Sequence, residues 1–214
     1  TSRNTQHLIA IETLKKIKQK FNLDLQAVDI IGKKNMCNQS GVHMLHSGEF
    51  AEFCKNLREK QGCMYFENIR QKGKISPEAQ NVLKKLKQES PMHVEELNSI
   101  NFQSDLCSYE MAAFLGKESQ VIIADYNYML NPNIRDSLLK RINKSLQDCI
   151  VIFDEGHNVP SRARDLLSST LTTFIIEAAA KETKYLGHNE MAQDILGIKE
   201  ILERLGKKIP LEKQ

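Results

Sequence analysis

Two short apolar runs separated by a helical pattern constrain the fold of this chain more than any other feature. The first run is "QVIIADY", residues 120–126, and the second opens "CIVIFDEGHNVPS", residues 149–161. Between them, "IRDSLLKRINKSL" has helical spacing and follows Pro132, a residue suited to a first helical turn. A strand, a helix and a second strand form a βαβ unit, which implies parallel strands and a right-handed crossover. We therefore predict an α/β fold with a parallel sheet.

The rest of the chain adds elements before and after this unit. Residues 7–20 form an amphipathic helical pattern, and "LQAVDIIG", residues 25–32, is typical of a short strand. From 35 to about 107 the periodicity is broken by glycine, asparagine, serine and charged residues, which indicates an insertion with its own organisation. A helix is expected at "YEMAAFLG", after the insertion, and further helices after residue 161.

Composition excludes several classes of protein. The 214 residues are 41% hydrophobic and 27% charged, which is ordinary for a globular protein, and the net charge of +3 does not by itself indicate nucleic-acid binding. The longest apolar runs are far shorter than the roughly 18 to 20 residues of a membrane span, and "TSRNTQHL" lacks a signal-peptide pattern. We expect a soluble, intracellular protein.

Four of the five cysteines lie in or at the end of the insertion. Cys37, Cys54, Cys63 and Cys107 have the spacing C-x16-C-x8-C-x43-C, without the short pairs of zinc modules. Four widely spaced thiolates can hold an iron–sulfur cluster, but the spacing equally allows four unrelated small apolar residues. His43 and His46 could in principle bind zinc, although loop histidines are more often solvated. Cys149 opens the second predicted strand, and we assign it to the core.

The second apolar run ends in a polar cluster that suggests nucleotide chemistry. In open α/β sheets, ligands bind at the carboxyl ends of strands. There Asp154 could bind Mg²⁺ directly or through water, Glu155 could act as general base, and His157 could link this site to other motifs. The alternative is a charged, solvated turn. Nucleotide hydrolysis also needs a phosphate cradle, and the sequence contains no G-x-x-x-x-G-K-[ST] motif. Either the nucleotide interpretation is wrong or the cradle lies upstream of Thr1.

Five features in order resemble a known family: "TSRNTQ", the four inserted cysteines, "CSYE", "VIIADYNYML" and "VIFDEGHN". Together they resemble the XPD helicases, the iron–sulfur branch of the superfamily 2 DNA helicases, and the archaeal members in particular. The resemblance covers essentially residues 1–175. It departs from the family at Gly156, where alanine is usual, and at Ser108, where proline is frequent. The Walker A segment and the second motor domain of the family are absent.

The resemblance implies roles for individual residues. "TSRNTQ" corresponds to helicase motif Ia, which implies that Arg3, Asn4 and Gln6 contact the DNA backbone. "DEGH" corresponds to motif II, the DEAH box, which contains Asp154, Glu155 and His157. The four inserted cysteines correspond to the ligands of a [4Fe–4S] cluster, namely Cys37, Cys54, Cys63 and Cys107.

The resemblance also implies a domain organisation. Residues 1–34 and 111–169 correspond to two parts of the first helicase motor domain. Residues 35–110 correspond to the iron–sulfur domain inserted between them, and residues 170–214 to the beginning of a helical Arch domain.

The implied activity is that of an ATP-dependent 5′–3′ DNA helicase that unwinds duplex DNA in nucleotide excision repair. Its cofactors would be a [4Fe–4S] cluster, Mg²⁺ and ATP. Its partners would be single-stranded and forked DNA, with no membrane, and the protein would be a monomer in the cytoplasm of an archaeal-like cell or in a eukaryotic nucleus. This chain is expected to be an incomplete fragment that does not hydrolyse ATP alone.

Charge patterning within the insertion fits a nucleic-acid surface. Residues 58–88 contain eight basic and three acidic residues, and the stretch that follows to residue 118 is acidic. Lysine and arginine contacts to phosphates provide affinity that is independent of sequence and sensitive to salt. For Lys84, Lys85 and Lys87, an ordinary solvated helix face is the alternative.

Two other functions remain open from the sequence. One is a zinc-stabilised, non-enzymatic nucleic-acid-binding module. The other is a cluster-containing nuclease, which would require a second acidic motif that is not evident in the sequence.

Overall fold

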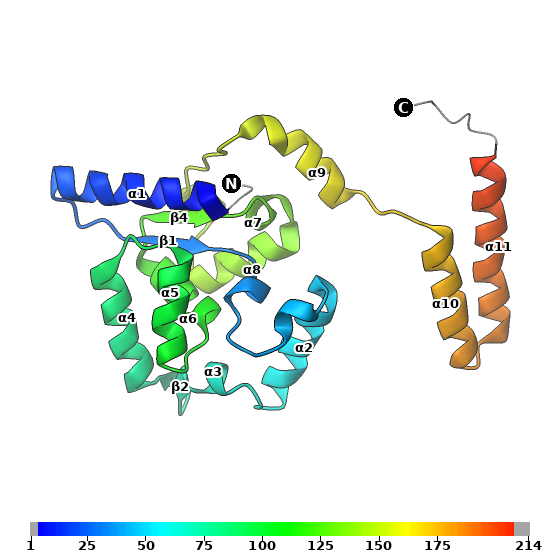
Figure 1. Cartoon of the computed structure of the whole chain (residues 1–214), viewed down its shortest axis with the longest axis horizontal. Helices are drawn as coiled ribbons and strands as arrows, with labels where there is room; N and C mark the ends of the chain where they lie inside the picture. The colour runs from blue at the N-terminus through cyan, green and yellow to red at the C-terminus, as the bar shows by residue number, and fades with distance from the viewer. Residues whose placement is uncertain (1–3, 208–214) are drawn as a thin grey trace. The chain divides into compact units, whose positions relative to one another are not determined.

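The computed structural model describes residues 4–207, with the side chains of residues 4 and 5 excepted, and divides the chain into two compact units, residues 1–163 and 164–214 (Figure 1). In the first unit the strands are β1 (Ala27–Ile30), β2 (Arg70–Gln71), β3 (Lys74–Ile75) and β4 (Val121–Ala124). Its α-helices are α1 (Asn4–Phe21), α2 (Ser47–Glu59), α3 (Met64–Glu67), α4 (Pro77–Glu89), α5 (Val94–Gln103), α6 (Ser108–Glu118), α7 (Asn127–Leu130) and α8 (Pro132–Ile142). Short 3₁₀ turns are η1 (Lys33–Met36), η2 (Val42–Met44), η3 (Leu146–Asp148) and η4 (Gly156–Asn158).

A parallel pair of strands forms the centre of the first unit. β1 and β4 run in register from Ala27 beside Val121 to Ile30 beside Ala124. Helix α1 lies along one face of this pair, and α6 packs against β1 on the other (Figure 1). The side chains of β1 alternate between these two faces. Asp29 contacts α1, whereas Val28 packs against α6. The predicted α/β character is therefore confirmed in its coarse form, as a small parallel sheet between helices.

The free edge of β1 is covered by the segment between α4 and α5, which belongs to the insertion. The Ser90 hydroxyl accepts a hydrogen bond from the Ala27 amide and donates one to the Ala27 carbonyl, each 2.8 Å long. Lys18 of α1 donates to the Ser90 carbonyl at 2.5 Å. These bonds satisfy backbone groups that a two-stranded sheet would otherwise leave open. The insertion is thus fastened to the sheet at the segment just after α4.

Local sequence signals explain where several helices begin. The Asn131 side chain accepts hydrogen bonds from the amides of Asn133 and Ile134, and Pro132 occupies the first turn of α8, as predicted. Ser76 caps α4 in the same way, with Pro77 next to it. Asn143 ends α8 in a left-handed conformation.

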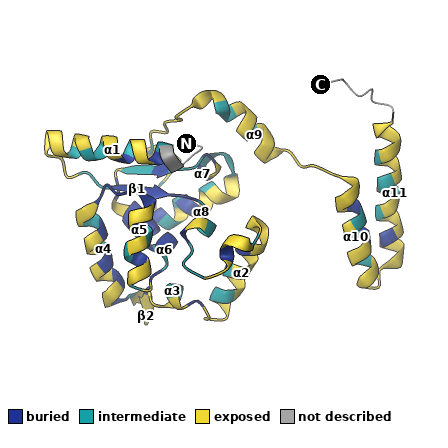
Figure 2. Ribbon diagram, viewed as in Figure 1, coloured by how far each residue is buried: buried dark blue, intermediate teal, exposed yellow. Residues whose placement is uncertain are grey.

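Many of the buried residues of this unit belong to the strand pair and to the helices α4, α5, α6 and α8 (Figure 2). Leu86, Leu97, Met111 and Leu115 are almost completely buried there. This core includes Met36 and Leu106, the residues that precede Cys37 and Cys107.

The strand predicted at residues 150–153 does not form. The segment has no regular secondary structure, and no strand pairs with it in the described part of the chain. Ile150 and Ile152 are 94% and 86% exposed. Val151 and Phe153 are about half as exposed. Exposure therefore alternates along the segment as it would in a strand, but the hydrogen bonds to a neighbouring strand are missing. An apolar run indicates that both faces can be buried, but it does not supply a neighbouring strand. Cys149 is half-buried and donates to the Ser145 carbonyl, so its assignment to a core strand was also wrong.

Helix α9 (Val159–Leu167) follows η4, and the second unit contains α10 (Thr173–Tyr185) and α11 (Asn189–Gly206). α10 and α11 form a helical hairpin in which Lys199 and Glu177 are 2.5 Å apart. None of the helices in the described range 4–207 combines the length and apolarity that crossing a membrane requires.

Candidate functional site

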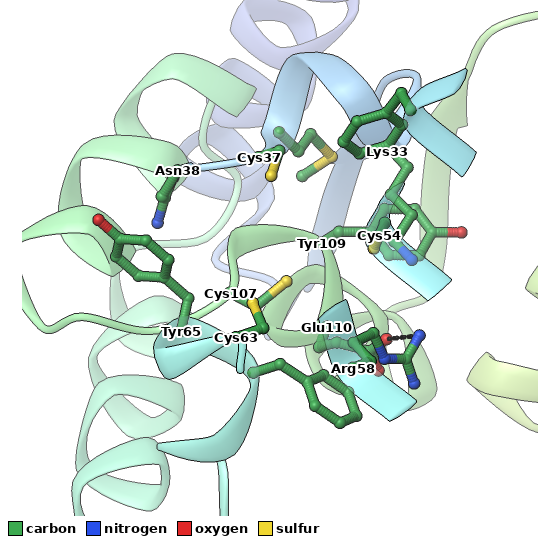
Figure 3. A pocket seen from close by; sticks show the side chains of 13 residues that line it. Lys33, Cys37, Asn38, Cys54, Arg58, Cys63, Tyr65, Cys107, Tyr109 and Glu110 are labelled. Carbon is green, nitrogen blue, oxygen red and sulfur yellow. Dashed lines mark ion pairs between the residues drawn. The ribbon is translucent and has the colours of Figure 1, made fainter. Parts of the chain in front are cut away.

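The four cysteines of the insertion line one pocket (Figure 3). Cys37 follows η1, Cys54 lies within α2, Cys63 precedes α3 and Cys107 precedes α6. All four are free thiols, and Cys63 is the most buried of them. The pocket encloses about 380 Å³ of space between protein atoms, part of it open to solvent. Residues up to 70 positions apart in the sequence thus meet around one space.

Backbone and side-chain donors point at the sulfur atoms. The amide of Gln39 donates to the thiol of Cys37, and the amide of Glu110 to that of Cys107. The Gln39 side chain lies 3.6 Å from the sulfur of Cys63. Donors of this kind stabilise thiolates and metal-bound sulfur. The donor set therefore fits a group that binds thiolates.

Burial opposes ionisation of these thiols when nothing positive is bound. Burial raises the pKa of Cys107 to about 11, with a smaller contribution from the charges of Glu110 and Cys63. The pKa of Cys37 is also raised, mainly by burial and then by the charges of Cys54 and Cys63. Lys33 acts in the opposite direction on both. A bound metal centre would have to displace the protons.

A charged network lies beside the sulfur atoms. Glu110 lies 2.6 Å from Arg141 and 3.8 Å from Arg58, and its own side chain is only 12% exposed. The Arg58 guanidinium also stacks on the ring of Phe66, 3.9 Å from its centre, so Phe66 packs beside the pocket. The network connects α2, α6 and α8, because Arg58, Glu110 and Arg141 belong to these three helices.

A second, basic cleft adjoins the cysteine pocket at Glu110. It encloses about 840 Å³ of space between protein atoms, including open solvent, and its charged residues are Arg70, Lys117, Lys140, Arg141 and Glu110. Glu110 is held by Arg141, so the remaining cations face the cleft without an acidic partner in its lining. The three remaining cations, Arg70, Lys117 and Lys140, suit the phosphates of a nucleic acid.

The acidic motif lies on an exposed turn. Asp154, Glu155 and His157 are all exposed, and Glu155 has a left-handed backbone conformation with φ of 52°. The His157 ring lies 3.3 Å from the Glu155 carboxylate. The Tyr126 hydroxyl lies against the carbonyl oxygens of Asp154 and Glu155, the latter at 3.0 Å. These contacts hold the turn next to the carboxyl end of β4.

Some predicted site residues are placed elsewhere or not described. Arg3 lies outside the described residues, Asn4 begins α1 without a described side chain, and Gln6 is half-buried in α1. His43 and His46 do not line the cysteine pocket. His46 instead caps α2, with its amide donating to Glu49 at 2.6 Å. Within residues 4–207, no three metal-binding side chains are placed to hold a single metal ion.

Sequence reasoning missed several residues around these sites. Lys33, Gln39 and Glu110 act on the cysteines, and Lys117, Lys140 and Arg141 line the basic cleft. The sequence signal for Gln39 and Glu110 is their position, two and three residues after a cysteine, where a backbone amide can reach the sulfur. No local signal marks Arg141, because it meets Glu110 only after α6 and α8 have packed.

Comparison with known proteins gives a consistent result. A protein from Caenorhabditis briggsae described as regulator of telomere elongation helicase 1 homolog is 28% identical over 153 residues, which are 71% of this chain and 14% of that protein. The general transcription and DNA repair factor IIH helicase subunit XPD/RAD3 of Saccharomyces cerevisiae is 25% identical over 192 residues, 81% of this chain and 23% of that protein. The Fanconi anemia group J protein homolog of Gallus gallus is 33% identical over 100 residues, 47% of this chain and 8% of that protein.

The chain thus spans less than a quarter of each of these relatives. The family model DEAD_2 matches residues 1–176, which is well over half of the chain. By this match, the chain is a member of the DEAD_2 family.

Proposed function

We propose that this chain is part of an ATP-dependent DNA helicase of the XPD type, and that it holds a [4Fe–4S] cluster and contacts DNA. The observation that carries the proposal is the meeting of Cys37, Cys54, Cys63 and Cys107 around one pocket. Membership of the DEAD_2 family and relatives described as helicases support it. In the full-length protein the activity would be 5′–3′ unwinding of duplex DNA in nucleotide excision repair.

The arrangement of the four cysteines around one pocket is compatible with a cluster of four iron atoms. A zinc ion requires its four ligand atoms within about 2.3 Å of one point. A cluster of four iron atoms instead takes one thiolate on each iron, so the sulfur atoms surround a space. The four cysteines come from four elements and line such a space. When bound, the cluster would link η1, α2, α3 and α6 covalently.

The chain's own residues have distinct tasks in this proposal. The four cysteines bind the cluster, while the Gln39 and Glu110 amides and Lys33 favour the thiolate forms. Arg70, Lys117 and Lys140 in the basic cleft bind DNA phosphates, and Arg3, Asn4 and Gln6 contact the DNA backbone. These cations provide affinity without sequence preference.

We assign the nucleotide chemistry of the full-length enzyme to the exposed turn after residue 153. Asp154 would bind Mg²⁺, Glu155 would activate the attacking water and His157 would connect this turn with other motifs. Exposure of this turn is compatible with a nucleotide bound between it and other parts of a longer protein. We assign residues 1–34 and 111–169 to the motor domain, 35–110 to the cluster domain and 170–214 to the start of an Arch domain.

The cluster proposal is tested by anaerobic purification of the chain and measurement of iron, acid-labile sulfide and visible absorbance. We expect about four iron atoms and four sulfides per chain. Changing Cys37, Cys54, Cys63 or Cys107 to serine should remove the chromophore, whereas Cys149→Ser is the matched control that keeps it. Zinc without sulfide would instead favour the non-enzymatic binding module, and an unchanged spectrum in Cys63→Ser would refute the ligand set.

The helicase proposal is tested in the full-length protein. Glu155→Gln should reduce ATP hydrolysis by a factor of about 100 or more, since general-base catalysis typically contributes 10² to 10⁴. DNA binding should be retained. Equal rates of ATP hydrolysis in Glu155→Gln and wild type would contradict the role given to Glu155. Unwinding of substrates with a 5′ or a 3′ single-stranded tail would determine the direction.

A further inference from the structure

A buried ionic junction joins the start of α1 to the strand pair and to the insertion. His7 of α1 and Asp29 of β1 are completely buried. The His7 Nδ1 atom lies 2.5 Å from Asp29 Oδ1, and its Nε2 atom lies 3.5 Å from Oδ1 of Asp125, which follows β4. Neither the cysteine pocket nor the acidic turn includes these residues.

The geometry favours the doubly protonated ring of His7. A neutral imidazole carries one N–H group, so one of its nitrogens would present a lone pair to a carboxylate. Here both nitrogens face carboxylate oxygens, and the ring satisfies both when each nitrogen carries a proton. The Nε2 contact at 3.5 Å is an ion pair and lacks hydrogen-bond geometry. Burial alone lowers the pKa of His7, but the two nearby carboxylates, those of Asp125 and Asp29, outweigh it and raise the pKa to about 9.

Asp29 also receives donors from the insertion. The Val94 amide, at the start of α5, donates to Asp29 Oδ2 at 3.0 Å. His93 Nε2 lies 3.6 Å from the same oxygen. The other ring nitrogen of His93 accepts from the Glu95 amide, so Nε2 carries the proton that faces Asp29. One carboxylate therefore ties α1, β1 and α5 together.

We propose that His7 is a positioning residue for DNA contact, because its imidazolium fixes the first turn of α1 against Asp29 and Asp125. This inference rests on the proposed function, in which Arg3, Asn4 and Gln6 contact DNA. His7 follows Gln6 directly, and α1 begins at Asn4, so the junction sets the position of the helical turn that contains Asn4 and Gln6. In the described part of the chain, the charged or titratable groups facing His7 and Asp29 are Asp125 and His93.

The test compares the whole chain with its His7→Gln variant. Binding of a labelled oligothymidine is measured by fluorescence anisotropy from pH 6.5 to above pH 9, at constant salt. As the pH rises across this range, the affinity of wild type for the oligothymidine should fall more than the affinity of His7→Gln. The variant should bind about 5-fold or more weakly at pH 6.5, the scale of an ordinary coupling between sites. His188→Gln, an exposed histidine of the second unit, is the matched control and should follow wild type.

Hydrogen exchange and NMR separate failure of this inference from failure of the proposed function. In wild type, the amides of the first turns of α1 should exchange faster above pH 9 relative to those of α8. In His7→Gln they should be fast at every pH. One imidazole signal should titrate near pH 9 and be missing from the variant. If wild type binds no DNA, the proposed DNA contact is wrong. Hydrogen exchange and the imidazole titration then still show whether His7 fixes the first turn of α1.

A second variant covers the case in which His7→Gln does not fold. Asp125→Asn keeps the 2.5 Å bond to Asp29 and removes only one charge. It should lower the titration midpoint of His7 and give intermediate exchange in α1. Identical pH profiles of affinity and exchange in wild type, His7→Gln and Asp125→Asn would overturn the inference.

Discussion

Arg141 donates a hydrogen bond of 2.6 Å to the carboxylate of Glu110, whose amide donates to the sulfur of Cys107. One residue therefore belongs to both the cysteine pocket and the basic cleft. Its carboxylate cancels part of the positive charge of the cleft while it holds α6 against α8. Stability and affinity for DNA should consequently respond in opposite directions when that charge is removed.

The Glu110→Gln variant should be less stable than wild type by about 2 kcal/mol, because a hydrogen bond to a charged group contributes roughly 1.5 to 3 kcal/mol. At low salt it should bind single-stranded DNA more tightly, because Arg141 is released into the cleft. Chemical denaturation and anisotropy measure the two effects. Glu118→Gln, on the same helix, removes an exposed carboxylate that pairs with Lys87; it is the control and should change stability by less than about 1 kcal/mol. Weaker DNA binding by Glu110→Gln would argue against a DNA site in the cleft.

The Lys140→Gln variant tests the basic cleft by removing a positive charge instead of a negative one. Lys140→Gln removes one cation that lines it, so DNA affinity should fall for all sequences alike. The slope of log affinity against log salt should decrease in magnitude by about 0.7, the value for one contact to a single strand. Lys55→Gln, an exposed lysine of α2 outside both pockets, should leave the slope unchanged. Equal slopes in wild type and Lys140→Gln would remove Lys140 from the proposed interface.

Sequence patterns predicted those helices whose formation depends on interactions between residues close together in the sequence. The amphipathic pattern of residues 7–20 became α1, and Pro132 marked the first turn of α8. Capping and periodicity act within a few residues, so a sequence shows them directly. The strand predicted at residues 150–153 failed because strand formation requires a partner from elsewhere, which the apolar run does not specify.

The candidate sites show the same division. Cysteine type and number indicated metal binding, but only packing brings Cys37 and Cys107 to the same pocket. The contacts of Glu110 with Arg141 and of His7 with Asp29 join residues 31 and 22 positions apart. Such pairs follow from how helices cross the sheet, and their residues look like ordinary surface charges in the sequence.

The protonation of His7 predicts a pH-dependent stability. Its pKa is raised from 6.5 to about 9 in the folded chain, so its contribution is complete below about pH 6.5 and is lost as the pH rises through about 9. At one pKa unit per 1.36 kcal/mol, the full loss is on the order of 3 kcal/mol. Denaturation at several pH values should show this loss in wild type. The His7→Gln variant should be less stable at low pH and should lack that part of the pH dependence.

Gly116 provides a test of the packing between α6, β1 and α8. A Cβ atom at this position would lie 3.0 Å from Ile142 Cγ2 and 3.5 Å from Val28 Cγ1. Gly116→Val should therefore destabilise the first unit by about 1 to 3 kcal/mol through overpacking. Gly197→Ala in α11 has open space around the new methyl group and should stabilise its helix by up to about 1 kcal/mol. Thermal unfolding of both variants should show shifts of opposite sign.

The Tyr126 hydroxyl provides a test of how the acidic turn is held. It lies against the carbonyl oxygens of Asp154 and Glu155, while its ring packs edge-on against Phe153 with centres 6.1 Å apart. Tyr126→Phe keeps the ring contact and removes the hydrogen bond, so the turn should loosen by about 1 kcal/mol.

Hydrogen exchange should then accelerate at the amides of residues 156–158 while those of α6 remain protected. Tyr185→Phe, a 90% exposed tyrosine of α10, should leave both regions unchanged. Because the carbonyl of Glu155 accepts the Asn158 amide at 2.9 Å, loss of the hydroxyl should be transmitted into η4 and so to His157. Unaltered hydrogen exchange in Tyr126→Phe would mean that the Tyr126 hydroxyl does not stabilise the acidic turn.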